Sequence, residues 1–171
     1  MDGFLDSALW MLRIGNRAGM ENRPVIKDLD DADSVRQHFK QRASEYSDAR
    51  RTGYTFLTQK RAVLRLLEGR EGKVLDVGCG AGHMLYDLQQ QGFETYGVDA
   101  IKEWVDIAKD NIRKIEGQTR IYLSVADVEK LPFSDCQFDA IICMGVLEFL
   151  SSYEPALREM YRVSKPNGIT V

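Results

Sequence analysis

The stretch VLDVGCGAGH at residues 74–83 joins a short apolar run to a segment with a helical pattern. The apolar run is typical of a strand that is buried on both faces of a sheet. Three glycines follow it at alternate positions, Gly78, Gly80 and Gly82. Glycines gather in this way where the backbone turns sharply or approaches a ligand closely. The stretch predicts a strand, a tight turn and a helix opened by Gly82, and the turn is either a ligand-binding loop or purely structural.

The chain after this stretch alternates between strand and helix patterns. Further strands are predicted at residues 93–99, 120–127 and 138–144, and a fifth begins at 169–171. Helices are predicted at residues 82–91, 102–115 and 154–163, the last ending at the KPNG segment. Such alternation predicts an α/β fold in which right-handed crossovers build a mostly parallel sheet with helices on both faces.

Three regions precede or form this core. Residues 1–33 are predicted to be an N-terminal arm and linker, 34–72 to be helices that form a lid, and 73–171 to be the core. The helices of residues 34–68 are expected to lie over the ligand. The first helix of the middle region is predicted to begin near Asp33 or Ser34, as N-cap residue. The second is predicted over residues 54–68, with its buried side formed by Leu57, Val63, Leu64 and Leu67. The arm has an apolar helical face that is too short to span a bilayer and is expected to dock on its own domain or on a second copy. Contact with a membrane surface is the alternative, disfavoured by the lack of a basic face.

Composition excludes several classes of protein. A net charge of −3 and a sequence pI near 5.5 argue against a non-specific nucleic-acid binder. Cys79, Cys136 and Cys143 are odd in number and lack the spacing of a metal site. They predict reduced thiols in a cytoplasmic protein without a structural metal. The N-terminus has neither the basic start nor the cleavage site of a signal peptide.

The residues around the glycine loop favour a cationic ligand without phosphate. In a parallel sheet, ligands bind beyond the carboxyl ends of the strands, where this loop is placed. The lysine and hydroxyl of a nucleoside-triphosphate loop are missing, and His83 stands where the dinucleotide fingerprint requires glycine. Asp76, just before the turn, would repel a pyrophosphate but attract a positive centre.

Two further carboxylates end the next strands. Asp99 ends the second strand, where a carboxylate accepts hydrogen bonds from ribose hydroxyls, the alternative being a solvated aspartate. Asp127 ends the third strand, where it could accept from the amine of adenine or simply form a turn. A cation, a ribose and an adenine together describe a nucleoside sulfonium.

The sequence resembles the class I S-adenosylmethionine-dependent methyltransferases, with nearest similarity to the small-molecule branch of ubiquinone and menaquinone biosynthesis. The similar stretches are VLDVGCGAG, GVDA, ADVEKLPFSDCQFDAIICMGVLEFL and LREMYRVSKPNG. The resemblance implies a Rossmann-like, doubly wound sheet, S-adenosylmethionine as cofactor, S-adenosylhomocysteine as product and a small-molecule methyl acceptor. The cofactor-binding residues that it implies are Tyr46, Asp76, Gly78, Cys79, Gly80, Asp99, Ala100, Asp127, Val128 and Met144.

The resemblance assigns each of these residues to one part of the cofactor. By resemblance, Gly78, Cys79 and Gly80 contact its methionine part, and Asp76 lies near the ammonium. Asp99 would bind the ribose, Ala100 would lie beside the adenine, and Asp127 with Val128 at the adenine edge. Met144 would line the sulfonium side, and Tyr46 would close over the cofactor from lid helices. His38 and His83 are expected to make structural hydrogen bonds.

Two features depart from the family pattern. Many relatives carry histidine after the glutamate of the stretch VLEFL, whereas this chain has Phe149, so no catalytic residue is assigned and Glu148 is expected to be structural. The family sheet has seven strands and this chain stops at Val171, inside the fifth, which predicts a fragment of a longer protein with an exposed edge at that strand. That edge, or the N-terminal arm, is a candidate surface for a homo-oligomer.

Four functions follow from these observations. The first is a small-molecule methyltransferase, and the second is a non-catalytic module that binds the cofactor or a partner. A nicotinamide-dinucleotide dehydrogenase is disfavoured by the missing third glycine. A nucleic-acid methyltransferase is disfavoured by the net charge and by the lack of a basic tract.

Overall fold

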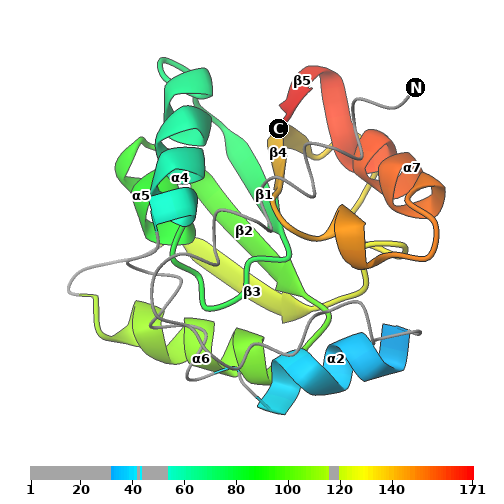
Figure 1. The fold of residues 1–171 in the computed structure, drawn as a ribbon. Coiled ribbons are helices and arrows are strands. Elements are labelled where there is room, and N and C mark those ends of the chain that lie inside the picture. Colours follow the sequence, from blue (N-terminus) through cyan, green and yellow to red (C-terminus); the bar gives the residue numbers. More distant parts are fainter. Residues whose placement is uncertain (1–31, 42, 44–53, 116–119) are drawn as a thin grey trace. The chain divides into compact units, whose positions relative to one another are not determined.

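The computed structural model describes residues 32–41, 43, 54–115 and 120–171. Their centre is one sheet of five strands: β1 (Lys73–Val77), β2 (Glu94–Asp99), β3 (Ile121–Val125), β4 (Phe138–Cys143) and β5 (Ser164–Thr170). The strand order is β3-β2-β1-β4-β5, and each neighbouring pair is parallel (Figure 1). The predicted α/β fold with a Rossmann-like parallel sheet is therefore confirmed.

Five α-helices and one 3-10 helix accompany the sheet in the described part of the chain. They are α2 (Ala32–Gln41), α4 (Tyr54–Leu66), α5 (Leu85–Gln90), α6 (Lys102–Arg113), η3 (Leu147–Phe149) and α7 (Glu154–Val163). No described helix has the combination of length and apolar character that crossing a bilayer requires. Figure 1 shows α7 on the β4–β5 side of the sheet, and α4 with α5 on the opposite side.

Two apolar clusters build the core, one on each face of the sheet. On one face, α7 contributes Ala156, Met160 and Val163 to a cluster with strand residues such as Leu75 and Ile141. On the other face, α4 and α5 pack on β1 and β4, in the cluster Val63, Leu67, Val74, Met84, Leu88, Phe93, Ala140 and Ile142. Alternate residues of β1 therefore enter different clusters, as the alternating geometry of a strand requires.

The helix α4 belongs to this second layer. It buries Phe56 and Val63, and Leu67 in the turn after it is fully buried, whereas Leu57 and Leu64 are half-buried. The helical period of the sequence predicted Val63 and Leu67 correctly and missed Phe56. Because α4 packs against a face of the sheet, the sequence-based expectation that all helices of residues 34–68 lie over the ligand does not hold for α4.

Three predicted boundaries are wrong. The helix after the glycine loop begins at Leu85 rather than Gly82, because residues 82–84 form turns in which the Leu85 N–H donates to the Gly82 carbonyl at 3.2 Å. The helix α2 already includes Asp33 and Ser34, so neither is its N-cap. The strand β5 includes the predicted KPNG stop, with a register shift between the pairs Phe138↔Ser164 and Ala140↔Ile169.

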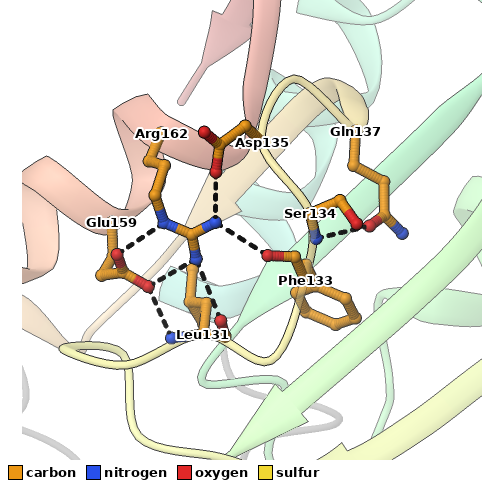
Figure 2. A network of polar contacts seen from close by, with 7 residues as sticks. All are labelled: Leu131, Phe133, Ser134, Asp135, Gln137, Glu159 and Arg162. Carbon is orange, nitrogen blue, oxygen red and sulfur yellow. Dashed lines mark hydrogen bonds and ion pairs between the residues drawn. The ribbon is translucent and has the colours of Figure 1, made fainter.

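The connection between β3 and β4 is held by one arginine rather than by a helix. The guanidinium of Arg162 on α7 donates to the carbonyls of Phe133 and Leu131 at 2.8 and 3.0 Å (Figure 2). It also pairs with Asp135 at 2.8 Å and with Glu159 at 2.7 Å. Because the Arg162 guanidinium bonds to this segment at three points, it fixes the path of the chain between β3 and β4.

Candidate functional site

The topology places a ligand site beside β1. The chain leaves β1 toward β2 on one side, while β4 flanks β1 on the other, and ligands of such sheets bind where the order reverses. The loop after β1, residues 78–82, and the segment after β4, residues 144–149, meet at this point. Their contact is direct, because a Cβ on Gly78 would lie 2.1 Å from Cγ2 of Val146.

The first three backbone amides of the glycine loop donate hydrogen bonds within the protein. The N–H groups of Gly78 and Cys79 both donate to the carbonyl of Val98, at 2.8 and 2.9 Å. The N–H of Gly80 donates to Oδ2 of Asp99 at 3.0 Å. A phosphate-binding loop needs such amides for its anion. In this loop the three amides bond to residues of β2 instead, which agrees with the prediction of a ligand without phosphate.

The carboxylate of Asp99 is positioned by two amides. Its Oδ2 accepts from Gly80 as described, and its Oδ1 accepts from the N–H of Ile101 at 2.9 Å. These two bonds fix the orientation of the carboxylate. Asp99 is half-buried at the end of β2. A carboxylate held at the end of this strand is suited to accept hydrogen bonds from a ribose diol.

A negative field surrounds the end of β1. Asp76 is 4% exposed and is the fourth of the five residues of β1. Burial raises the pKa of the Cys79 thiol well above its usual value, and the charges of Asp76 and Asp99 raise it further. Burial, Asp76 and then Glu148 raise the pKa of Cys143 to about 12. Both thiols are therefore protonated. Burial opposes a charge of either sign, whereas the negative charges of the nearby carboxylates favour a cation.

The three residues predicted near the adenine, and Met144, predicted at the sulfonium side, occupy different environments. Ala100 is exposed, just after β2, and Met144 is half-buried after β4. Asp127 forms a turn, with its Oδ1 accepting from the N–H of Glu129 at 3.0 Å. The side chain of Val128 is 6% exposed and belongs to the core cluster on the α7 face, so it is the Val128 backbone that remains for a ligand.

The helix α2 lies next to the carboxyl ends of β2 and β1. An open cavity of about 430 Å³ separates Gln37, Lys40 and Gln41 from the segment 100–103. Lys40 pairs with Glu103 at 3.0 Å, and the ring of Phe39 meets that of Phe149 edge to face at 5.1 Å. Figure 1 shows α2 on the side to which the arrows of β2 and β3 point.

Ala43, just beyond α2, adds an apolar contact between this part of the chain and the glycine loop. It is buried in a small cluster with Ala81 of the glycine loop and Trp104 of α6. Tyr46 and the side chain of His38 lie outside the described residues. His83 is half-buried, with its ring 6.2 Å from that of Phe56, a contact that suits its expected structural role.

Sequence reasoning missed four residues of this region: Gln37, Phe39, Lys40 and Val146. Gln37 and Lys40 are three residues apart and share one side of α2, a spacing that a helical pattern could have revealed. The role of Val146 depends on how two loops meet and has no signature in the local sequence.

A protein-family model described as a methyltransferase domain matches residues 75–171. It covers more than half of the chain, and the chain belongs to this family, the S-adenosylmethionine-dependent methyltransferases of class I. The predicted family is thereby confirmed.

Individual relatives support the same assignment. The uncharacterized methyltransferase YcgJ of Bacillus subtilis is 37% identical over 98 residues, which are 57% of this chain and 38% of that protein. Its crystal structure has a TM-score of 0.61, with 65% of this chain and 47% of that chain covered at 34% identity. The demethylmenaquinone methyltransferase of Deinococcus radiodurans is 29% identical over 86% of this chain and 63% of its own length. This chain thus spans less than two thirds of both curated relatives.

One structural neighbour is named for another reaction. The [4+2]-cyclase SpnF is 32% identical, has a TM-score of 0.61, and is covered over 42% of its chain by 66% of this one. The same fold at similar identity thus includes a protein whose name is not that of a methyltransferase.

Proposed function

We propose that this protein binds S-adenosylmethionine at the carboxyl ends of β1 and β2 and transfers its methyl group to a small molecule. The observation that carries the proposal is the amide-oriented carboxylate of Asp99 beside a glycine loop whose first three amides donate within the protein. A carboxylate at this strand end suits a ribose, and amides that are already bonded do not suit a phosphate.

The buried carboxylate of Asp76 supports the cationic part of the ligand. Its charge already acts on Cys79 and Cys143, so the end of β1 disfavours anions and favours an ammonium or sulfonium group. When bound, the cofactor would supply a methyl carbon activated by its sulfonium. The work left to the protein is alignment of the acceptor and exclusion of water.

In this proposal the helix α2 covers the nucleoside end. The 430 Å³ cavity between α2 and residues 100–103 begins one residue after Asp99, and Ala43 beyond α2 packs on Ala81 of the loop. Tyr46 would extend this cover. The absence of histidine at Phe149 suits an acceptor that loses no proton to this segment.

Titration calorimetry tests the binding. We expect heat from both S-adenosylmethionine and S-adenosylhomocysteine, and expect Asp99→Ala to weaken binding by ~1–3 kcal/mol because bound hydroxyls lose a buried partner. Glu68→Ala, at an exposed position after α4, is the matched control. If folded wild-type protein gives no heat with either ligand, or if Asp99→Ala binds as well as Glu68→Ala, the proposal is wrong.

A module that binds the cofactor without methyl transfer is the second candidate. It is supported by the aromatic pair Phe39–Phe149, which stands where relatives carry a base, and by the cyclase among the structural neighbours. The two candidates differ in one measurement. A radiolabelled methyl group should pass from the cofactor to components of a small-molecule extract if the first is correct, and should stay on the cofactor if the second is.

A further inference from the structure

The strand β3 forms one edge of the sheet and has no second neighbour in the described part of the chain. The Arg120 carbonyl accepts from Thr95, and the Ala126 N–H donates to Asp99 on β2. Since successive residues of a strand direct their main-chain groups to opposite sides, the odd-numbered residues direct theirs outward. Ile121, Leu123 and Val125 thus present N–H and C=O groups to the outer edge.

This edge lacks the features that normally protect one. The sequence of β3 is IYLSV, without a charge, proline or glycine. Two of its side chains are exposed large hydrophobics, Tyr122 at 50% and Val125 at 49%. The opposite edge, β5, has the sequence SKPNGIT and a register shift, both of which discourage a further strand. An unprotected edge is a template for strand addition.

A groove with cationic walls runs beside the same edge. It has a volume of about 340 Å³ and is lined by Lys109, Ile112 and Arg113 of α6 and by Ile121, Tyr122 and Leu123 of β3. Arg113 pairs with Asp110 within α6 at 3.0 Å, an exposed pair of the kind that contributes little and exchanges readily. An added strand would place every second side chain against these cations.

We propose that β3 accepts an extended segment of a partner protein, in which acidic residues alternate with apolar ones. Leu123 lies on the helix face of β3, because it packs toward Gly97 and Leu85, whereas the Tyr122 ring stacks on Tyr96 on the other face at 4.9 Å. The acidic side chains of the added strand face Lys109 and Arg113, and its apolar side chains cover Tyr122.

The charges favour a different protein over a second copy of this chain. If two β3 strands paired antiparallel about a two-fold axis, the α6 helices would lie on one face of the joined sheet. Lys109 and Arg113 of one copy would then approach those of the other, and like charges across an interface oppose association. An acidic strand has no such cost.

A labelled peptide that alternates Glu and Val tests the proposal on the full chain. We expect it to bind, and expect Lys109→Glu with Arg113→Glu to weaken binding by roughly tenfold or more. A peptide of the same composition with Glu and Val in separate blocks should bind the wild type correspondingly less well. Arg158→Glu, a charge reversal on the exposed side of α7, is the control for a change of charge away from the groove and should bind normally. Hydrogen exchange at the Leu123 and Val125 amides should slow in the complex.

Three results would overturn the proposal. They are the absence of binding to folded wild-type protein, equal binding by the groove variant and the α7 control, and no slowing of exchange at β3 in a saturated complex. Sedimentation velocity without peptide adds a fourth, since self-association abolished by Leu123→Pro would assign the edge to a second copy. Because Lys109 and Arg113 are exposed, the groove variant should keep the wild-type melting temperature.

Discussion

Carboxylates bind loop amides in two regions of this protein, but their electrostatic surroundings differ. At the α7 network, Glu159 accepts from the Leu131 N–H at 2.8 Å while its charge is compensated by Arg162. At the end of β2, Asp99 accepts from Gly80 and Ile101 in the same way. The hydrogen bond to Arg162 lowers the pKa of Glu159. Around Asp99, by contrast, the carboxylates act on thiols.

The difference separates a structural role from a binding role. The α7 network compensates its charges within itself, so it needs no further ligand. The site of Asp76 and Asp99 imposes its negative charge on Cys79, whose pKa is raised by burial and then by both carboxylates. The pairing of an amide with a carboxylate therefore does not by itself identify a site, because both regions contain it.

The largest effect on stability is expected when a side chain is added to the glycine loop. Gly78→Ala would place a methyl group 2.1 Å from Cγ2 of Val146 at a φ of +73°. We expect a loss of ~2–5 kcal/mol in the free energy of unfolding, combining the cost of a left-handed residue with overpacking. Chemical denaturation measures it.

Gly69→Ala is a matched control for this change. Gly69 has the same φ of +73°, but a Cβ there meets nothing within 4 Å. It should cost only the conformational part, ~1–2 kcal/mol. Equal losses for the two variants would show that Val146 yields easily, and that the two loops of the site are not tightly packed.

The next effect should come from the α7 network. Arg162→Met removes bonds to Glu159, Asp135 and two carbonyls, and we expect a loss of ~2–3 kcal/mol, the scale for charged hydrogen bonds in a partly exposed setting. Arg158→Met breaks only the exposed pair with Glu154 and should cost at most ~0.5 kcal/mol. A similar loss in both variants would contradict the structural role of Arg162.

The pH dependence sharpens this prediction. The pKa of Glu159 is lower in the folded protein than its ordinary value of 4.5, so folding leaves it with fewer bound protons. The ionised Glu159 makes its full contribution to the free energy of unfolding above about pH 4.5. This contribution is lost as the pH falls through the lower pKa of the folded state. The free energy of unfolding, measured between pH 3 and 6, should therefore fall less steeply with decreasing pH in Arg162→Met than in wild type.

Much of the fold was predictable because its signals are local. The strands and α7 follow from apolar runs and a helical period, and residues 154–163 were predicted as the helix that the structure contains. The start of α5 was wrong because the turns after Gly82 depend on bonds to the Cys79 and Gly82 carbonyls, which a helical pattern does not reveal. The bulge in β5 was missed because Pro166 and Gly168 were taken as the end of a helix rather than as part of an edge strand.

The residues of the site that lie at the ends of strands could be predicted from the sequence. Asp76 and Asp99 follow from the position of each strand, so their convergence needs only the parallel topology. The neighbours from α2 and from residues 144–149 depend on tertiary packing. Val128 was expected at the adenine edge, and the burial of its side chain in the core cluster of the α7 face depends on tertiary packing as well.

A smaller effect tests the negative field of the site. Asp76→Asn removes a charge that raises the pKa of Cys143, after burial the largest cause of its value near 12. We expect alkylation of Cys143 at pH 8.5 to become faster, on the order of threefold, because the thiolate is the reactive form. Cys136, which is exposed, is the internal reference, and Asp110→Asn, on the exposed side of α6, is the matched variant. An unchanged rate ratio in Asp76→Asn would contradict the proposed field.

The smallest effect concerns the pair Lys40–Glu103, which joins α2 to α6 next to the site. The two groups are 3.0 Å apart, and their side chains are 61% and 41% exposed. Water and salt screen such a pair, so Lys40→Met should change the free energy of unfolding by no more than ~0.5 kcal/mol. Even this difference should disappear in 0.5 M salt, where the screening length is about 4 Å. The apolar contacts of Phe39 with Phe149 and of Ala43 with Trp104 remain in the variant, and they are the contacts expected to hold α2 in place. A loss above ~1 kcal/mol that persists in salt would show that α2 depends on this ion pair and that compensated charges also build the border of the site.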